Sequence, residues 1–168
     1  MSKYADLRIE YKKAMLEETT VKSDPLAQFD QWFNEAVAAE IPEPNAFTLA
    51  TVGENGTPSA RVLLLKGVDH GGFVFYTNYT SDKAKDIKQF PVGSMVFLWL
   101  GLERQVRISG PISKVSREES EAYFHSRPRE SQIGAWVSPQ SRIIESRDVL
   151  EQNLVEANER FKDVEVIP

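Results

Sequence analysis

Short β-rich runs separated by turn residues fill the middle of this 168-residue chain, and this pattern constrains the fold more than any other feature. One turn is Asn55-Gly56, because an Asn-Gly pair readily adopts the positive φ angles of a hairpin; Gly71-Gly72 and Gly101 mark two more. The five runs span residues 47–52, 59–68, 73–77, 94–100 and 105–115. Five such strands predict a small antiparallel barrel, because closing a sheet removes its exposed edges.

Apolar residues recur at helical spacing before and after this region. Asp24-Pro25 marks a helix start, and Ser116 with Glu119 forms a capping box. The expected helices span residues 4–18, 25–40, 81–90 (capped by Ser81), 116–127, 131–137 and 146–162. We therefore expect one α+β domain over residues 1–168, mainly β with flanking helices: N-terminal helices in 1–44, barrel strands in 45–115 and a helical region in 116–168.

The composition excludes several kinds of chemistry. The chain has no cysteine, which rules out disulfides, thiolate nucleophiles and cysteine-ligated metal centres. Its two histidines, His70 and His125, are far apart in the sequence, and no clustered pattern predicts a metal site. A formal charge of −5 argues against a nucleic-acid interface, which needs many uncompensated cations. No apolar stretch reaches the roughly 18 residues of a membrane span and no secretory signal is recognisable, so we expect a cytoplasmic protein.

Basic residues at strand ends are the main chemical feature, since no nucleophile–base pair or glycine-rich phosphate loop is recognisable. Arg61 and Lys66 flank the apolar run Val62-Leu63-Leu64-Leu65. In a regular strand they point to opposite faces and lie roughly 17 Å apart, so they cannot hold one small phosphate. An elongated ligand with a charged tail and a planar head could contact both. Alternatively, both side chains simply extend into solvent at the two ends of the strand.

Three further groups allow both a binding and a structural interpretation. Tyr76-Thr77 ends a strand just before Ser81-Asp82-Lys83, where a helix N-terminus and a lysine would stabilise an anion, although Ser81 also suits a plain N-cap. Gln105 shares a predicted strand face with Glu103 and Arg107, which would equally suit a solvated charge ladder. Tyr123 and Arg127 share one helix face, where Arg127 would also complement the helix dipole.

Four runs, taken together, resemble the pyridoxamine 5'-phosphate oxidase family in their order and spacing. They are Arg61–Lys66, Phe75–Asn78, Leu102–Val106 and the long run Tyr123–Ser141, within a resemblance that extends from about Leu7 to Pro168. The resemblance implies an FMN-binding split β-barrel that forms a homodimer, with two FMN molecules at the subunit interface. It also implies oxidation of pyridoxamine or pyridoxine 5'-phosphate by O2 to pyridoxal 5'-phosphate, with release of H2O2, in vitamin B6 metabolism.

The resemblance also implies roles for individual residues. The residues for which it implies FMN contacts are Arg61, Val62, Leu63, Leu64, Lys66, Tyr76, Thr77, Lys83, Gln105, Gln140 and Ser141. Of these, Gln105 would contact the FMN from the other subunit. It implies contacts to the substrate phosphate for Lys66, Tyr123, Arg127 and Ser131, and closure of the segment from Arg8 to Tyr11 over the substrate. Converting an amine or alcohol to an aldehyde removes two electrons, which a redox cofactor must accept.

Two departures from the family pattern bear on this expectation. Asp82 stands where the family usually has arginine, and an anion beside a phosphate would weaken FMN binding. The family's Trp-Gly-Gly and Arg-Leu-His-Asp-Arg segments follow the equivalent of Pro168 and are absent from this sequence, so catalytic residues are not assigned. The alternatives are a split-barrel protein that binds FMN or pyridoxal 5'-phosphate without turnover, and a dimeric scaffold that binds neither.

Overall fold

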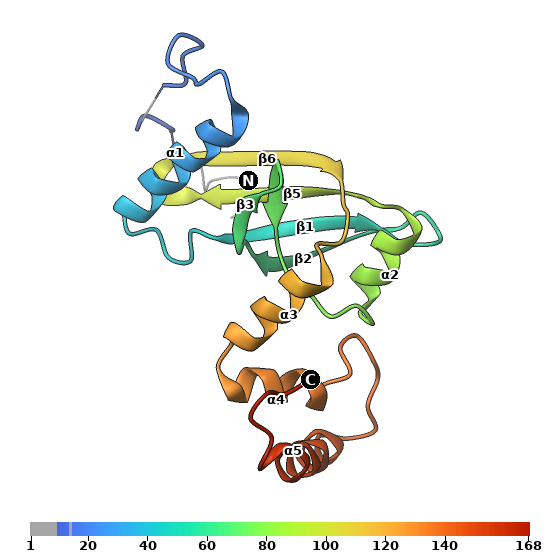
Figure 1. Ribbon diagram of the computed structural model, residues 1–168. Helices are drawn as coiled ribbons and strands as arrows, with labels where there is room; N and C mark the ends of the chain where they lie inside the picture. The colour runs from blue at the N-terminus through green and yellow to red at the C-terminus, as the bar shows by residue number, and fades with distance from the viewer. Residues whose placement is uncertain (1–9, 14) are drawn as a thin grey trace. The chain divides into compact units, whose positions relative to one another are not determined.

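The computed structural model describes residues 10–13 and 15–168 and has an α+β architecture (Figure 1). Its helices are α1 (Pro25–Ala38), α2 (Asp82–Gln89), α3 (Arg117–Ser126), α4 (Arg129–Val137) and α5 (Arg147–Phe161), with a 3-10 turn η1 (Leu100–Leu102). Its strands are β1 (Ala46–Val52), β2 (Pro58–Leu64), β3 (Gly67–Asp69), β4 (Gly72–Val74), β5 (Val92–Trp99) and β6 (Arg104–Pro111). The expected α+β class is confirmed, but the expectation of a mainly β chain is wrong, because more of the described residues lie in α-helices than in strands.

Residue contacts divide the chain into two compact units. The first unit contains residues 61–75, residues 94–109 and the described part of residues 1–49; the second unit contains residues 50–60, 76–93 and 110–168. A four-stranded sheet has the order β2-β1-β5-β6, and the two-stranded sheet β3-β4 belongs to the first unit. The expectation of one domain over residues 1–168 stays a prediction.

The run predicted as one strand at residues 59–68 forms two strands, β2 and β3, so that prediction is wrong at its centre. Backbone hydrogen bonds explain the break. The N–H of Leu65 donates to the carbonyl of Asn45 at 2.8 Å, whereas the N–H of Lys66 donates to the carbonyl of Val74 at 2.9 Å. The chain thus changes its pairing partner here, and β3 continues into an antiparallel hairpin with β4. Lys66 therefore lies in a connection between strands.

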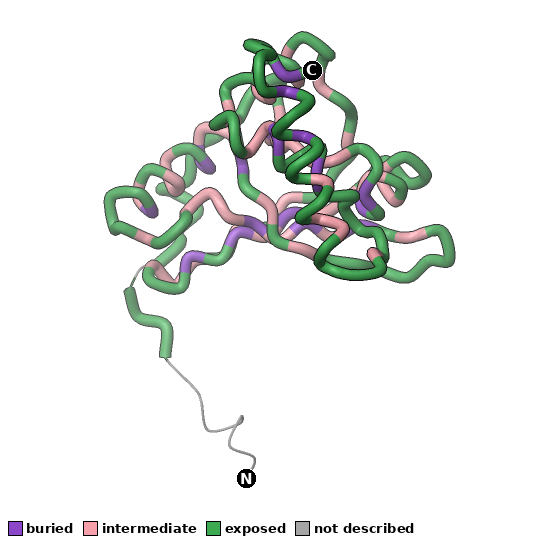
Figure 2. Tube along the Cα trace, turned by 90° about the horizontal axis from the view of Figure 1, so that it is seen from below, coloured by how far each residue is buried: buried purple, intermediate pink, exposed green. Residues whose placement is uncertain are grey.

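Aromatic side chains form the core of the first unit. The ring of Phe29, on α1, is 3% exposed and lies 4.8 Å from Phe73, 5.0 Å from Phe97 and 6.1 Å from Trp99, measured between ring centroids. The indole Nε1 of Trp99 donates to the carbonyl of Pro44 at 2.9 Å, which satisfies its one polar group. Alternate residues of β1 and β5 are buried, as expected of strands with one covered face, and Figure 2 shows buried positions as separate purple segments.

The N-terminal segment differs from its prediction as a helix over residues 4–18. Its described residues, 10–13 and 15–18, contain no helix, and the other predicted positions lie outside the described residues. The backbone N–H groups of Lys12 and Lys13 donate to the carboxylate of Glu103 at 2.7 and 2.9 Å. In a helix, N–H groups donate to carbonyls four residues earlier, so a distant side chain has replaced the local partner.

Side-chain caps confirm two predicted helix starts and correct a third. Asp24 accepts from two first-turn N–H groups of α1 at 3.1 and 3.3 Å. The hydroxyl of Ser116 accepts from the N–H of Glu119 at 3.1 Å, which is one half of the predicted capping box at α3. Ser81 precedes α2 as predicted, but its side chain makes no cap: the hydroxyl donates to the carbonyl of Asn78 at 2.7 Å and accepts from Nζ of Lys83 at 3.2 Å.

Helices α3, α4 and α5 carry most of the apolar core of the second unit. All three were expected from the sequence, although α4 begins at Arg129 and not at Ser131. The core consists of Ile133, Val137, Ala157, Phe161 and Ile167, with Phe124 and Leu150 packed against them. Within the described residues, every helix falls short of the length and apolar character needed to cross a membrane.

Candidate functional site

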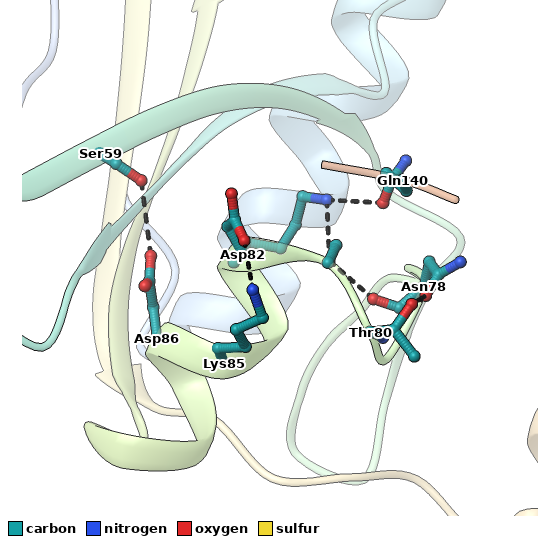
Figure 3. A network of polar contacts seen from close by, with 9 residues as sticks. Ser59, Asn78, Thr80, Asp82, Lys85, Asp86 and Gln140 are labelled. Atoms are coloured by element: carbon teal, nitrogen blue, oxygen red, sulfur yellow. Dashed lines mark hydrogen bonds and ion pairs between the residues drawn. The ribbon is translucent and has the colours of Figure 1, made fainter. Parts of the chain in front are cut away.

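Lys83, a buried lysine in the first turn of α2, contacts Gln140, one of the residues labelled in the polar network of Figure 3. Lys83 is 7% exposed, and its Nζ donates to the hydroxyl of Ser81 at 3.2 Å and to Oε1 of Gln140 at 2.9 Å. Burying an ammonium group without polar partners costs free energy, so these two hydrogen bonds favour this position of the Lys83 side chain. The structure thus joins two of the residues to which the resemblance gave FMN contacts, Lys83 and Gln140. Ser141, which follows, is exposed with a positive φ of 62°.

Two carboxylates on α2 take different partners (Figure 3). Asp82 is at the surface, where its Oδ1 accepts from Nζ of Lys85 at 2.6 Å; this hydrogen bond is the main cause that lowers the pKa of Asp82. Asp86, one turn later, accepts from the hydroxyls of Thr51 at 2.7 Å and Ser59 at 3.5 Å. Those hydroxyls flank the hairpin turn at Asn55, so Asp86 joins α2 to this hairpin within the second unit.

Tyr76 and Tyr123 stack face to face, with ring centroids 3.7 Å apart and an interplanar angle of 5°. The hydroxyl of Tyr76 donates to Oε1 of Glu119 at 3.2 Å. Burial, followed by this hydrogen bond and the nearby negative charge, raises the pKa of Tyr76. The stack joins a residue with an implied FMN contact to one with an implied substrate contact. Thr77, next in the chain, is half-buried.

Arg127 lies at the junction of α3 and α4. Its Nη2 donates to the carbonyl of Ser131 at 2.8 Å, and its own carbonyl accepts from the amide of Gln132 at 2.8 Å. The guanidinium carbon is 5.8 Å from the centroid of the Phe124 ring. Arg127 therefore contacts Ser131 through the backbone carbonyl, and the implied contact of both residues with the substrate phosphate stays a prediction. Tyr123 lies four residues before Arg127, in the last turn of α3.

In the first unit, the apolar run between Arg61 and Lys66 alternates between exposed and covered side chains. Val62 is 67% exposed and Leu64 is 37% exposed, whereas Leu63 is half-buried. The guanidinium of Arg61 donates from Nη1 to the carbonyl of Leu49 at 3.2 Å. Lys66 is exposed. Arg61 therefore does not simply extend into solvent, and exposed apolar residues separate it from Lys66.

Glu103 occupies the turn before β6, so the prediction that it shares a strand face with Gln105 and Arg107 is wrong. It has a positive φ of 53°, outside the extended region. Its carboxylate accepts from Lys12 and Lys13, and the Nζ of Lys13 donates to the carbonyl of Gly101 at 2.8 Å. We call this group of contacts the Glu103 clamp.

The Glu103 clamp holds Lys12 and Lys13, which directly follow the segment from Arg8 to Tyr11. The resemblance implies that this segment closes over the substrate. Tyr11 is 74% exposed, and Arg8 lies outside the described residues.

The first unit also contains a cavity of about 340 Å³ beside Gln105. Glu35 and Arg104 form an ion pair of 2.8 Å in its wall, and the guanidinium of Arg104 lies 5.3 Å from the centroid of the Trp32 ring. Hydrogen bonds from Gln31 and then Arg104 lower the pKa of Glu35. Over residues 10–13 and 15–168, no group of three or more His, Asp or Glu side chains could hold a metal ion.

Two carboxylates without a predicted site role lie beside predicted site residues. Glu119 contacts Tyr76, and Asp86 lies one turn after Lys83 on α2. The capping-box pattern identifies Glu119 only as a helix-start residue, and no sequence pattern singles out Asp86. Their partners lie 43 and 35 residues away in sequence, beyond the reach of local patterns.

Comparison with known proteins gives consistent family matches. A family model described as pyridoxamine 5'-phosphate oxidase matches residues 33–161. A pyridoxine/pyridoxamine 5'-phosphate oxidase of Burkholderia lata is 56% identical over 163 residues, which cover 97% of this chain and 76% of that protein. The chain therefore spans about three quarters of the length of this relative.

Two solved structures resemble this fold. PhzG from Burkholderia lata, in complex with tetrahydrophenazine-1-carboxylic acid, has a TM-score of 0.83 and 24% sequence identity, covering 92% of this chain and 77% of that chain. A pyridoxamine 5'-phosphate oxidase-related, FMN-binding protein from Nostoc punctiforme has a TM-score of 0.59 and 21% identity, covering 73% and 70%. At these identities the likeness shows a shared fold.

Proposed function

Because this chain belongs to the pyridoxamine 5'-phosphate oxidase family, we propose that it binds FMN and oxidises pyridoxamine or pyridoxine 5'-phosphate. In the proposed reaction, O2 is reduced to H2O2 and the product is pyridoxal 5'-phosphate. The alcohol substrate loses two electrons and two protons; the amine substrate additionally consumes water and releases ammonia. FMN, when bound, supplies the two-electron chemistry that no side chain provides.

The observation that carries this proposal is the buried ammonium group of Lys83 in the first turn of α2. A helix N-terminus presents unpaired backbone N–H groups, and an adjacent lysine adds a full positive charge. This donor set fits a phosphate such as that of FMN. Gln140 and Ser81 hold the ammonium in place, so binding requires little reordering of the side chain.

The junction of α3 and α4 suits the phosphate of the substrate. A guanidinium has five N–H donors, and the hydrogen bond from Arg127 to the carbonyl of Ser131 uses one of them while fixing the side chain. Phosphate recognition by arginine is strong because its paired donors match two phosphate oxygens. Tyr123 and the hydroxyl of Ser131 would add neutral hydrogen bonds to the same phosphate. These groups bind and orient the substrate.

Exposed apolar residues support the proposed homodimer. Val62, Leu64, Leu98 and Leu100 are 67%, 37%, 56% and 67% exposed, and all belong to the first unit near or on β2 and β5. Large apolar side chains that form one exposed patch favour burial by a partner, and we propose that these four form such a patch. We propose that a second copy covers it, completing a split β-barrel with two FMN molecules at the interface and Gln105 contributed across it.

The proposal is tested with purified protein reconstituted with FMN. Addition of pyridoxamine or pyridoxine 5'-phosphate under air is expected to give pyridoxal 5'-phosphate and H2O2 in a one-to-one ratio, and catalase is expected to remove the peroxide signal. Tight binding of FMN or pyridoxal 5'-phosphate without peroxide would indicate a binding protein. A colourless protein that takes up neither ligand would contradict both functions.

A further inference from the structure

One face of α3 contacts Tyr76 at two points. Glu119 and Tyr123 are four residues apart and therefore neighbours on the surface of the helix. The hydroxyl of Tyr76 reaches the carboxylate of Glu119, and its ring covers the ring of Tyr123. The hydrogen bond fixes the tip of the side chain and the stack fixes its plane. Tyr76 therefore has little freedom to rotate while α3 keeps this face toward it.

The other carboxylates of α3 have different partners. Glu121 accepts from the guanidinium of Arg117 at 2.6 Å, on an exposed part of the helix. Glu118 interacts with its own backbone and with Ser116, and both interactions lower its pKa. Glu119 is the α3 carboxylate that accepts from Tyr76, and a hydroxyl donates more strongly to an ionised acceptor than to a neutral one.

We propose that Glu119 is a positioning residue that holds Tyr76 against Tyr123, so that FMN and the phosphorylated vitamin B6 compound bind cooperatively. This inference rests on the proposed function, in which Tyr76 contacts FMN and Tyr123 contacts the substrate phosphate. A ligand that orders the ring of Tyr76 or Tyr123 also orders the other ring, because the two rings stack face to face. Coupling between two binding sites is reciprocal, so each ligand must tighten the other by the same factor.

The test measures the dissociation constant of FMN by quenching of flavin fluorescence, with and without saturating pyridoxal 5'-phosphate. In the unmodified protein we expect the second ligand to tighten FMN binding about 5-fold or more, the lower range of measured couplings. Glu119→Ala is expected to reduce this factor to about 1. Glu119→Gln keeps a carbonyl acceptor for the Tyr76 hydroxyl and is expected to retain most of the coupling. Glu121→Gln, on the same helix, is the matched control.

A double-mutant cycle separates the hydrogen bond from any other contact of Glu119. Tyr76→Phe removes the hydroxyl and keeps the ring, so it is expected to reduce the coupling as Glu119→Ala does. The double variant is expected to lose no more than either single variant, because both remove the same interaction. Additive losses, or equal coupling in Glu119→Ala and Glu121→Gln, would overturn the inference. So would independent binding of the two ligands to the unmodified protein.

A ligand-free measurement separates failure of this inference from failure of the proposed function. If neither ligand binds, the proposed function fails, and the near-ultraviolet circular dichroism of the stacked tyrosines still reports on Glu119. We expect Glu119→Ala to weaken that signal and Glu119→Gln and Glu121→Gln to preserve it, with unchanged far-ultraviolet spectra as the check on folding. Identical near-ultraviolet spectra in all variants would overturn the positioning role.

Discussion

Lys83 donates a hydrogen bond of 2.9 Å from Nζ to Oε1 of Gln140, although the two residues are 57 positions apart in the sequence. The bond joins the first turn of α2 to the loop after α4, inside the second unit. It places an amide acceptor on one side of a buried cation and leaves the helix N-terminus beside it. A ligand phosphate held by Lys83 would therefore be sensitive to changes at both positions.

Replacing Lys83 by alanine is expected to weaken FMN binding about 10- to 100-fold, the effect of losing one hydrogen bond to a charged group. Gln140→Ala is expected to weaken it by a smaller factor, because it removes a neutral partner of the lysine. Titration of flavin fluorescence measures both effects. Lys88→Ala, an exposed lysine on the same helix, is the control, and an equal loss in this variant would contradict a specific role for Lys83.

Arg127→Ala is expected to raise the KM for pyridoxamine 5'-phosphate about 10- to 100-fold and to change kcat much less. The guanidinium would contact the substrate phosphate throughout the reaction, so its loss weakens the ground state and the transition state alike. Steady-state kinetics of the FMN-loaded protein provide the measurement, with the exposed Arg117→Ala as control. An unchanged KM would reject the phosphate contact.

Asp82→Arg is expected to tighten FMN binding, because it replaces an anion near the proposed phosphate position by a cation and also releases Lys85 from its ion pair. The lowered pKa of Asp82 means that the carboxylate stays ionised at neutral pH. Asp82→Asn, which removes the charge without adding one, is expected to give an intermediate affinity. Equal or weaker binding in Asp82→Arg would show that Asp82 faces away from the phosphate.

Tyr76→Phe is expected to flatten the loss of stability at alkaline pH. Burial and Glu119 raise the pKa of Tyr76 above its ordinary value of 10.0, so the folded state favours the neutral phenol. That contribution is fully present below about pH 10 and is lost as pH rises through the raised pKa, because the unfolded chain ionises first. Urea unfolding between neutral and alkaline pH tests this, with exposed Tyr79→Phe as control. Identical slopes for the unmodified protein and Tyr76→Phe would contradict it.

Glu103→Ala is expected to accelerate tryptic cleavage after Lys12 and Lys13 several-fold, because their backbone N–H groups lose both hydrogen bonds to the Glu103 clamp. Mass spectrometry of timed digests of ligand-free protein measures the rate. Glu40→Ala is the matched control, since Glu40 has a similar φ of 52° and is also exposed. Equal cleavage rates in the two variants would show that the clamp does not hold the segment.

The sequence predicted those elements whose signals are local. Asp24-Pro25 and Ser116 carry the information for a helix start in the residues that form it, and both starts are confirmed. The segment at residues 10–18 has helical spacing, yet its N–H groups find a partner at Glu103, about 90 residues away. The break between Leu65 and Lys66 likewise depends on pairing with Asn45 and Val74, which no local pattern contains.

The candidate site shows the same limit. The family resemblance identifies four of the candidate residues individually, but it does not predict which of them are in contact. These residues are Lys83, Gln140, Tyr76 and Tyr123. The pairing of Lys83 with Gln140 and the stack of Tyr76 on Tyr123 arise from packing between distant segments. The sequence predicts Glu119 only as part of the capping box, and its N–H does donate to Ser116. Its side chain, however, accepts a hydrogen bond from Tyr76, which the capping box does not predict.

The hydroxyls of Thr51 and Ser59 hold Asp86 on α2, one helical turn after Lys83. The tip of their hairpin, at Asn55 and Gly56, is exposed. These two hydrogen bonds thus join α2 to a surface loop that carries no proposed ligand contact. A fluorescent dye attached at position 55 would therefore report any shift of α2 that a phosphate-bearing ligand causes.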